Sequence, residues 1–268
     1  MITDSVNVAK VWDIVDDPAA TLHGMYDEVG GPLYASLCLE DRHEVSEYIA
    51  ALRATTGPVL ELAAGNGRLT FPMLAAGHQV VATEFSPTML GLLKEKIAHA
   101  PSTVRKRIKT ILADMRKFDL RQQFGAIVLG ATSISLLDES GRGAMFAMVR
   151  KHLQKGGRFL VTTLDLSEQA RNDVHSEHVM RDSSGQAYLL AERVDSAGAS
   201  REVVLAPLAP TDNGSVSFVC HSIVAVLTVE VLASEARAAG LMLESVVLCQ
   251  GYEGRHRLYL LTFVVEEE

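Results

Sequence analysis

Residues 59–70 constrain the fold of this chain more than any other segment. They read Val-Leu-Glu-Leu-Ala-Ala-Gly-Asn-Gly-Arg-Leu-Thr, an apolar run that contains an acid and then breaks into two glycines separated by one residue. This pattern is typical of a buried strand that turns sharply into a helix, because glycine adopts positive φ and leaves room for a ligand beside the backbone. The segment therefore predicts a strand, a ligand-binding loop that contains Gly65 and Gly67, and a helix.

A second acid narrows the class of ligand. Glu84 ends the next apolar run, about twenty residues after the glycine loop, where an acid is placed to bind a ribose. Dinucleotide-binding loops have a third glycine three residues after the second, and Thr70 occupies that position here. Glu61 would repel a pyrophosphate, whereas it suits a ligand with a cationic amino group. The sequence therefore favours a nucleoside that carries an amine over a dinucleotide.

These residues resemble the first motif of the class I S-adenosylmethionine-dependent methyltransferases, which reads acid-x-x-x-Gly-x-Gly. Ala63 stands where many members have a further glycine. Later segments are similar to the family's third strand, its fourth strand with the following loop, and its glycine turn into a fifth strand, at residues 110–115, 124–133 and 155–163. The resemblance covers about residues 57–165 and resumes near 230–265.

The resemblance implies the residues that bind S-adenosylmethionine. Glu84 would bind the ribose, and Asp114 would accept a hydrogen bond from the adenine amino group, unless it only caps the turn that follows. Phe85 and Met89 either pack on the adenine ring or belong to the core. The complete set of expected cofactor-binding residues is Tyr34, Glu61, Ala63, Gly65, Gly67, Arg68, Glu84, Phe85, Ser86, Met89, Asp114, Met115, Gly130 and Ser133.

The expected fold is α/β, with a doubly wound, mostly parallel, seven-stranded sheet of the Rossmann-like methyltransferase type. An N-terminal helical cap and an antiparallel β insertion accompany it. The cap has helical patterns at residues 33–39 and 40–52, preceded by a turn at Gly30-Gly31-Pro32. The expected boundaries are 1–56 for the cap, 57–165 for the cofactor core, 166–227 for the insertion, which shapes the acceptor or dimer region, and 228–268 for the end of the core sheet.

Catalysis needs little from the protein, because the methyl group of the cofactor is already electrophilic. The protein must align a nucleophile and exclude water, and a hydroxyl or enol would also need a base. Tyr26 and Tyr34 resemble tyrosines that small-molecule N-methyltransferases place over the methionine end of the cofactor; the alternative is an amphipathic cap with half-buried tyrosines. His178 is the candidate proton acceptor, and a helical turn would place it on one face with His175. Tyr26 and His178 are the expected catalytic residues, and no metal site is expected.

The layout of cap, core and insertion is similar to amino-sugar N,N-dimethyltransferases and to glycine or sarcosine N-methyltransferases. Residues 26–34 also resemble, more narrowly, methyltransferases of daptide-type ribosomal peptide pathways, which dimethylate a terminal amine. The sequence is therefore interpreted as a methyltransferase of an amine nitrogen in a natural product or peptide, acting by in-line displacement. The alternatives are O- or C-methylation of a small metabolite, a nicotinamide-dependent oxidoreductase, and a cofactor-binding regulator without turnover.

Composition limits the partners. The chain has 25 Lys and Arg against 33 Asp and Glu, a net charge of −8, which disfavours nucleic acid as a substrate. Its three cysteines are far apart and odd in number, which is typical of reduced thiols. No apolar run is long enough to span a membrane and no secretion signal is present, so we expect a cytoplasmic protein, and a homodimer is a further expectation.

Overall fold

The computed structural model describes residues 8–19, 21–38, 42–167, 175–182, 184–208, 218–250 and 256–266. The chain divides into two compact units: unit 1 contains residues 1–40 and 171–224, and unit 2 contains residues 41–170 and 225–268. Each unit has its own sheet and its own apolar core.

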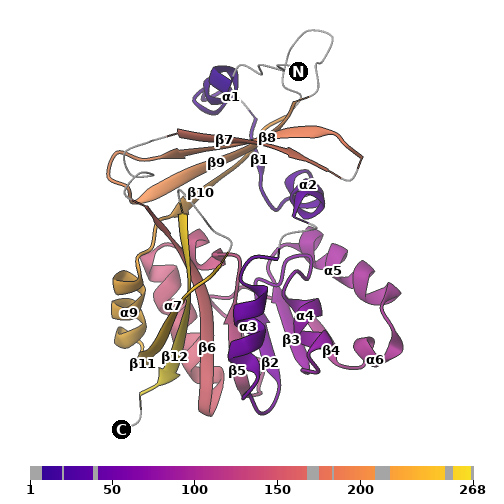
Figure 1. Cartoon of the computed structure of the whole chain (residues 1–268), viewed down its shortest axis with the longest axis vertical. Helices are drawn as coiled ribbons and strands as arrows, with labels where there is room; N and C mark the ends of the chain where they lie inside the picture. Colours follow the sequence, from indigo (N-terminus) through magenta and orange to yellow (C-terminus); the bar gives the residue numbers. More distant parts are fainter. Residues whose placement is uncertain are drawn as a thin grey trace. The chain divides into compact units, whose positions relative to one another are not determined.

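Unit 2 contains a seven-stranded sheet, which confirms the predicted fold class (Figure 1). In spatial order the strands are β11 (Leu241–Leu248), β12 (His256–Val265), β6 (Leu153–Leu166), β5 (Phe124–Leu129), β2 (Val59–Leu62), β3 (Val80–Glu84) and β4 (Ile108–Leu112). The strands from β2 to β6 run parallel, and β12 is antiparallel to both of its neighbours. β2, β3 and β5 are buried along their whole length, because helices cover both faces of a parallel sheet.

Helices cover the two faces of this sheet. Leu60 and Ile127 pack on one face with Phe146 of α7 (Glu139–His152) and Leu232 of α9 (Val229–Ala238). The other face carries α3 (Val45–Leu52), α4 (Thr70–Ala75) and α5 (Pro87–His99) (Figure 1). The short helices of this unit are α6 (Ser102–Arg105) and the 3₁₀ helix η1 (Ser133–Leu136).

The order of the strands creates a topological switch point between β2 and β5. From β2 the chain continues to β3 and β4 on one side, and it then returns to β5 and β6 on the other. The last residues of the two strands, Leu62 and Leu129, are register partners. The loops that follow β2 and β5 therefore start side by side at the carboxyl ends of the strands, where doubly wound sheets bind their ligands.

Unit 1 contains a five-stranded sheet with a helix on each face (Figure 1). Its strands, in spatial order, are β1 (His23–Gly24), β10 (Cys220–Ala225), β9 (Ser200–Pro207), β8 (Ala187–Val194) and β7 (His175–Arg181). α1 (Val8–Val15) packs on one face through Val11, and α2 (Gly30–Leu37) packs on the other through Leu33. β7, β8 and β9 are antiparallel, as predicted for the insertion, whereas β1 pairs with β10 in parallel.

Two local predictions are wrong. Gly30-Gly31-Pro32 is the first turn of α2 rather than a break before it. The side chain of Asp27 accepts hydrogen bonds from the backbone N–H groups of Val29 and Gly30, both at 2.8 Å, and a proline in the first turn loses no helical bond. Residues 175–181 form strand β7 instead of a helical turn, because they pair with β8 along their whole length.

The predicted boundary at residue 56 also differs from the division of the chain. α3 belongs to unit 2, because Tyr48 is fully buried there and donates a hydrogen bond to the carbonyl oxygen of Leu129 at 2.7 Å. Residues 39–41, 168–174 and 209–217, which include parts of the predicted helices and strands, lie outside the described residues. Cys220 and Cys249 are buried free thiols, and Cys38 is a half-buried one. Among the helices that the structure describes, none has the length and apolar character needed to cross a membrane.

Candidate functional site

The loop after β2 adopts the backbone conformation that its glycines predict. Gly65 has a φ of +56° and Gly67 a φ of +94°, which side chains rarely tolerate. A Cβ on Gly67 would also lie 2.7 Å from Cδ1 of Leu93. Ala63 is left-handed as well, with a φ of +49°, which explains why a glycine would suit that position. The loop therefore presents bare backbone at the switch point.

Glu61 lies beneath this loop rather than on its surface. Its side chain is 2% exposed and accepts a hydrogen bond from the hydroxyl of Thr70, the first residue of α4. Burial raises the pKa of Glu61 to about 8, although the bond from Thr70 acts in the opposite direction. Near neutral pH most Glu61 side chains therefore carry a proton, and the acid supports the loop without contributing a full negative charge.

Glu84 holds the same loop from the end of β3. One carboxylate oxygen accepts a hydrogen bond from the backbone N–H of Gly65 and the other from that of Ser86, both at 2.8 Å. Each oxygen keeps a further lone pair, so the carboxylate can still accept bonds from two ligand hydroxyls. Phe85 follows with 68% of its surface exposed, whereas Met89 is buried under Gly65. Of these two candidates for a contact with adenine, only Phe85 has an accessible side chain.

Asp114 lies after β4 and is paired within its own loop. Its carboxylate accepts bonds from the backbone N–H of Arg116 at 2.8 Å and from the guanidinium of the same residue at 2.6 Å. The hydrogen bond from the Arg116 side chain holds the pKa of Asp114 below its ordinary value. Asp114 is therefore a fixed carboxylate beside Met115, and its predicted adenine contact remains a proposal.

The loop after β5 completes the edge of the site. Ala131 and Thr132 both have a φ of +53°, and Ser133 donates its backbone N–H to the carbonyl oxygen of Gly130 at 3.0 Å. A Cβ on Gly130 would lie 2.2 Å from Leu69, so only glycine allows the two loops to approach so closely. Strained left-handed residues cluster at functional sites. Four of the five non-glycine residues of this kind in the described chain, namely Glu44, Ala63, Ala131 and Thr132, belong to this region.

A buried ion pair connects the two loops. Glu44, the residue before α3, accepts hydrogen bonds from the guanidinium of Arg68 in the first loop and from the backbone N–H of Ala131 in the second, the latter at 2.7 Å. Arg68 also donates to the carbonyl oxygen of His43 at 2.8 Å. The site thus combines a carboxylate for hydroxyl groups, an exposed aromatic ring, bare loop backbone and a buried acid.

Comparison with known proteins identifies the family. A sequence profile described as a methyltransferase domain matches residues 59–157. The crystal structure of the glycopeptide N-methyltransferase MtfA in complex with S-adenosylmethionine is similar at 30% identity, covering 92% of each chain, with a TM-score of 0.65. This chain belongs to the S-adenosylmethionine-dependent methyltransferases.

Two further solved structures place the methyltransferase among related folds. The complex of MtfA with S-adenosylhomocysteine is 31% identical over 94% of this chain and 90% of that chain, with a TM-score of 0.63. CcbJ from Streptomyces caelestis is 22% identical over 84% of this chain and 89% of that chain, with a TM-score of 0.69, and shares the fold. No curated protein sequence matches the chain.

The residues of unit 2 fit S-adenosylmethionine, the cofactor of the family. Glu84 has free lone pairs for the ribose hydroxyls, and Phe85 offers an apolar surface beside it. The glycine loop and the loop from Gly130 to Ser133 would hold the remainder, with the buried Glu44 between them. The predicted cofactor and the predicted enzyme class are confirmed, and the contacts of individual residues are proposals.

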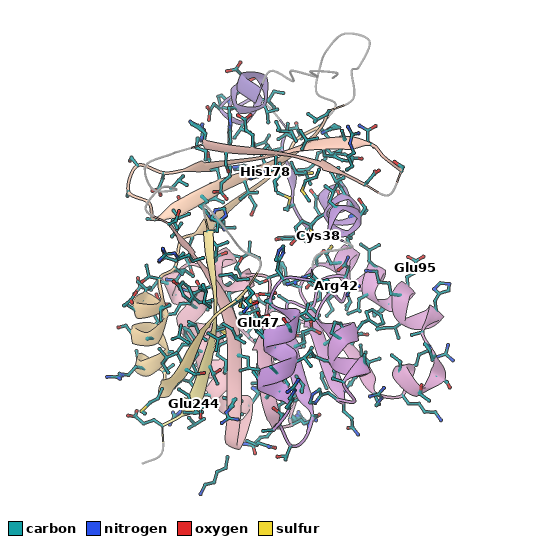
Figure 2. All side chains as sticks on the ribbon, in the orientation of Figure 1. Cys38, Arg42, Glu47, Glu95, His178 and Glu244 are labelled. Atoms are coloured by element: carbon teal, nitrogen blue, oxygen red, sulfur yellow. The ribbon has the colours of Figure 1, made fainter. Side chains whose placement is uncertain are left out.

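The predicted catalytic residues lie in unit 1, on one face of its sheet. The rings of Tyr26 and Tyr34 make an edge-to-face contact with centroids 5.2 Å apart, and both residues pack on the apolar cluster under α2. His178, exposed on β7, is the register partner of Leu190, which belongs to the same cluster (Figure 2). Directly paired residues point to the same face of a sheet, so His178 shares the α2 face with the two tyrosines.

His175 points to the other face. It lies three residues before His178 in an extended strand, and its ring is 6.2 Å from that of Trp12 in α1. The two histidines cannot converge on one metal ion or on one proton, because side chains alternate along a strand. The predicted sharing of one face is therefore wrong.

Sequence reasoning overlooked two buried charged groups. Glu44 belongs to no motif, and only its position just before a helix hinted at a role. Glu192 and Arg201 form a buried ion pair in unit 1, with Nη1 and Oε2 2.6 Å apart, and alternation along β8 places it on the α2 face. The alternation of apolar residues with Glu192 in β8 was the one available signal.

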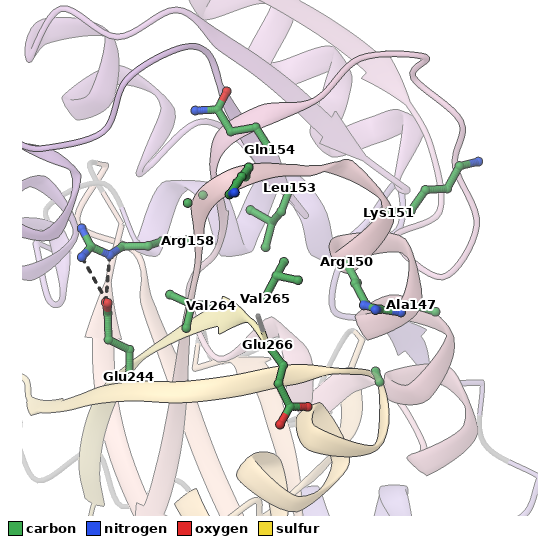
Figure 3. A pocket seen from close by; sticks show the side chains of 14 residues that line it. Ala147, Arg150, Lys151, Leu153, Gln154, Arg158, Glu244, Val264, Val265 and Glu266 are labelled. Atoms are coloured by element: carbon green, nitrogen blue, oxygen red, sulfur yellow. Dashed lines mark hydrogen bonds and ion pairs between the residues drawn. The ribbon is translucent and has the colours of Figure 1, made fainter. Parts of the chain in front are cut away.

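A large hollow lies elsewhere in unit 2 (Figure 3). It measures about 1060 Å³ and is lined by the end of α7, the start of β6 and parts of β11 and β12. Arg158 and Glu244 pair across its wall at 2.8 Å. The hollow lies at the amino end of β6, away from the carboxyl ends where the loops meet, and none of the predicted cofactor residues lines it.

Proposed function

We propose that the methyltransferase transfers a methyl group to the nitrogen of an amine in a natural product or a peptide. The observation that carries the proposal is the extent of the similarity to the glycopeptide N-methyltransferase MtfA, which covers 92% of this chain and so includes residues of both units. A similarity limited to the seven-stranded sheet of unit 2 would bear only on cofactor binding. The net charge of −8 agrees with a cationic acceptor, because a negative protein attracts amines from solution.

In the proposed reaction the cofactor supplies an electrophilic methyl group, and the protein supplies alignment. Glu84 and the glycine loop fix the nucleoside end, since the carboxylate is itself held by two backbone N–H groups. The loop after β5 is held by the hydrogen bond from the backbone N–H of Ala131 to Glu44. Such fixed geometry accelerates an in-line displacement by removing the entropic cost of aligning the reactants.

An amine attacks only through its neutral nitrogen, so the acceptor must lose a proton before or during transfer. We propose that the α2 face of unit 1 binds the acceptor, that Tyr26 contacts it and that His178 accepts this proton. The support is that Tyr26, Tyr34 and His178 lie on one face of the sheet, with the buried pair of Glu192 and Arg201. A ring nitrogen of histidine can accept a proton and release it again, which suits this role.

Paired acceptors test the proposed atom. Purified enzyme is incubated with labelled S-adenosylmethionine and with peptides or amino sugars that differ only in whether the amine is free or acetylated. The expected result is one or two added methyl groups on the free amine and none on the acetylated partner, with fragmentation mass spectra that place them on nitrogen. Methylation of the acetylated acceptors on oxygen or carbon would replace the proposal with O- or C-methylation.

The narrower proposal is dimethylation of the terminal amine of a ribosomal peptide. It rests on the resemblance of residues 26–34, which form the start of α2 and the Asp27 cap before it. A peptide with a free terminal amine and a lysine distinguishes the sites. Two methyl groups on the terminal nitrogen support the proposal, and modification of lysine alone contradicts it.

A further inference from the structure

Glu44 has an arrangement that the family motifs do not explain. Its side chain is 2% exposed, and its backbone has a φ of +63°, a conformation that costs free energy for a residue with a side chain. One oxygen, Oε1, accepts both the bond from Arg68 and the bond from the Ala131 N–H. The surroundings therefore hold this carboxylate firmly at the switch point between β2 and β5.

The second oxygen has a different environment. Oε2 is enclosed, and it has no hydrogen-bond partner among the residues that the structure describes. An enclosed acceptor without a donor is costly, and such atoms are rare in folded proteins. The position between two ligand-binding loops indicates that the donor comes from a ligand.

The acids around the two loops indicate that this ligand group is a cation. Glu61, the acid of the first motif, is occupied by Thr70, and its burial raises its pKa to about 8. Glu84 is engaged at the nucleoside end with Gly65 and Ser86. Glu44 is thus the buried carboxylate that touches both loops and has an unused oxygen, which suits a cationic donor.

We propose that Oε2 of Glu44 accepts a hydrogen bond from the α-ammonium group of S-adenosylmethionine. Glu44 then recognises the amino-acid end of the cofactor. Arg68 orients the carboxylate of Glu44 and balances part of its negative charge. The proposal concerns the cofactor site of the family and does not depend on the identity of the acceptor. An acceptor amine is the other source of an ammonium group, and the experiment separates the two.

Calorimetric titration without any acceptor tests the proposal. The ligands are S-adenosylhomocysteine, its analogue with hydrogen in place of the α-amino group, and 5′-methylthioadenosine, which lacks the amino-acid end. Wild-type protein should bind S-adenosylhomocysteine about 10-fold or more tightly than the deaminated analogue, the scale of a charge-assisted hydrogen bond. In the Glu44→Gln variant this ratio should fall close to one, with unchanged affinity for 5′-methylthioadenosine.

Glu235→Gln is the matched control. Glu235 on α9 also forms an ion pair with an arginine, Arg142 on α7, at 2.6 Å, and this pair is partly buried. The control should keep the wild-type ratio between the two ligands.

Three results would overturn the proposal. The first is that wild-type protein binds the deaminated analogue and S-adenosylhomocysteine with equal affinity, a result that needs no variant. An equal loss of affinity for all three ligands in Glu44→Gln would show that Glu44 only supports the loops. Unchanged cofactor binding with a raised KM for the acceptor amine would assign Glu44 to the acceptor instead.

Discussion

The hydroxyl of Thr70 donates a hydrogen bond to the buried carboxyl group of Glu61, which joins the first residue of α4 to the middle of β2. Thr70 stands where a dinucleotide-binding loop would have its third glycine. In dinucleotide-binding proteins that glycine lets the helix pack closely on the strand. Here a hydrogen bond between two side chains joins the helix to the strand instead. The burial of Glu61, which the bond from Thr70 only partly offsets, makes the stability of unit 2 dependent on pH.

The first prediction concerns that dependence. The pKa of Glu61 rises from an ordinary value of 4.5 to about 8 in the folded protein, mainly because of burial. Between these two values the folded state binds a proton that the unfolded state has lost, so the free energy of unfolding falls as the pH rises. Relative to Glu61→Gln, the wild type should lose up to about 1.4 kcal/mol per pH unit in this range. Urea unfolding at several pH values measures the difference.

The control for this prediction is Glu95→Gln, which changes an exposed glutamate on α5 (Figure 2). It should follow the wild type at every pH. A wild-type curve parallel to that of Glu61→Gln would contradict the assigned proton.

The second prediction concerns Glu84. Glu84→Ala removes the acceptor for the backbone N–H groups of Gly65 and Ser86 together with the proposed ribose contact. S-adenosylhomocysteine should bind about 1–3 kcal/mol more weakly, the scale of a lost charge-assisted bond. Calorimetry gives the value, and Glu95→Ala should leave it unchanged. Equal affinities for Glu84→Ala and the wild type would refute the ribose role.

The third prediction compares two glycines in unit 2. Gly130→Ala places a Cβ 2.2 Å from Leu69 and 3.0 Å from Oε1 of Glu44, so the loops after β2 and β5 must separate. The variant should bind S-adenosylhomocysteine at least about 10-fold more weakly, since one displaced contact costs about 1–3 kcal/mol. Gly143→Ala in α7 meets nothing within 4 Å and should raise the unfolding free energy by about 0.5–1 kcal/mol. If Gly130→Ala bound as tightly as Gly143→Ala, the close approach of the loops would be unnecessary.

The fourth prediction tests His178 as a proton acceptor. His178→Ala should lower kcat by about 10²-fold or more and remove the acidic limb of its pH profile, as the loss of a general base does. His175→Ala, on the other face of the same strand, should change neither. Steady-state rates across pH decide between them. An undiminished rate in His178→Ala would leave alignment as the whole catalytic contribution of the protein.

The sequence predicted the cofactor core well because its signals are local. Short apolar runs that end in glycine or an acid locate β2, β3 and β5, and the two glycines locate the loop. The start of α2 was also readable, since Asp27 precedes Gly30 by three residues and a proline follows in the first turn. It was missed because a Gly-Gly-Pro sequence usually marks a turn.

The remainder depends on contacts between distant residues. The role of Glu44 requires α3 to approach a loop 87 residues further along the chain, and no local pattern encodes that approach. The conformation of residues 175–181 is decided by pairing with β8, which overrides their polar, helix-compatible composition. The contacts of Tyr34 and Asp114 with the cofactor remain predictions, because they depend on the bound ligand.

The origin of unit 1 in two separate stretches of chain has a consequence for engineering. β1 and α2 come from the first 40 residues, whereas β7 to β10 come from residues after 170. A graft of residues 171–224 alone would leave β10 without its parallel partner β1 and Cys220 without the cover of Leu33. Chimeric enzymes made to exchange unit 1 must therefore carry both stretches from the same parent.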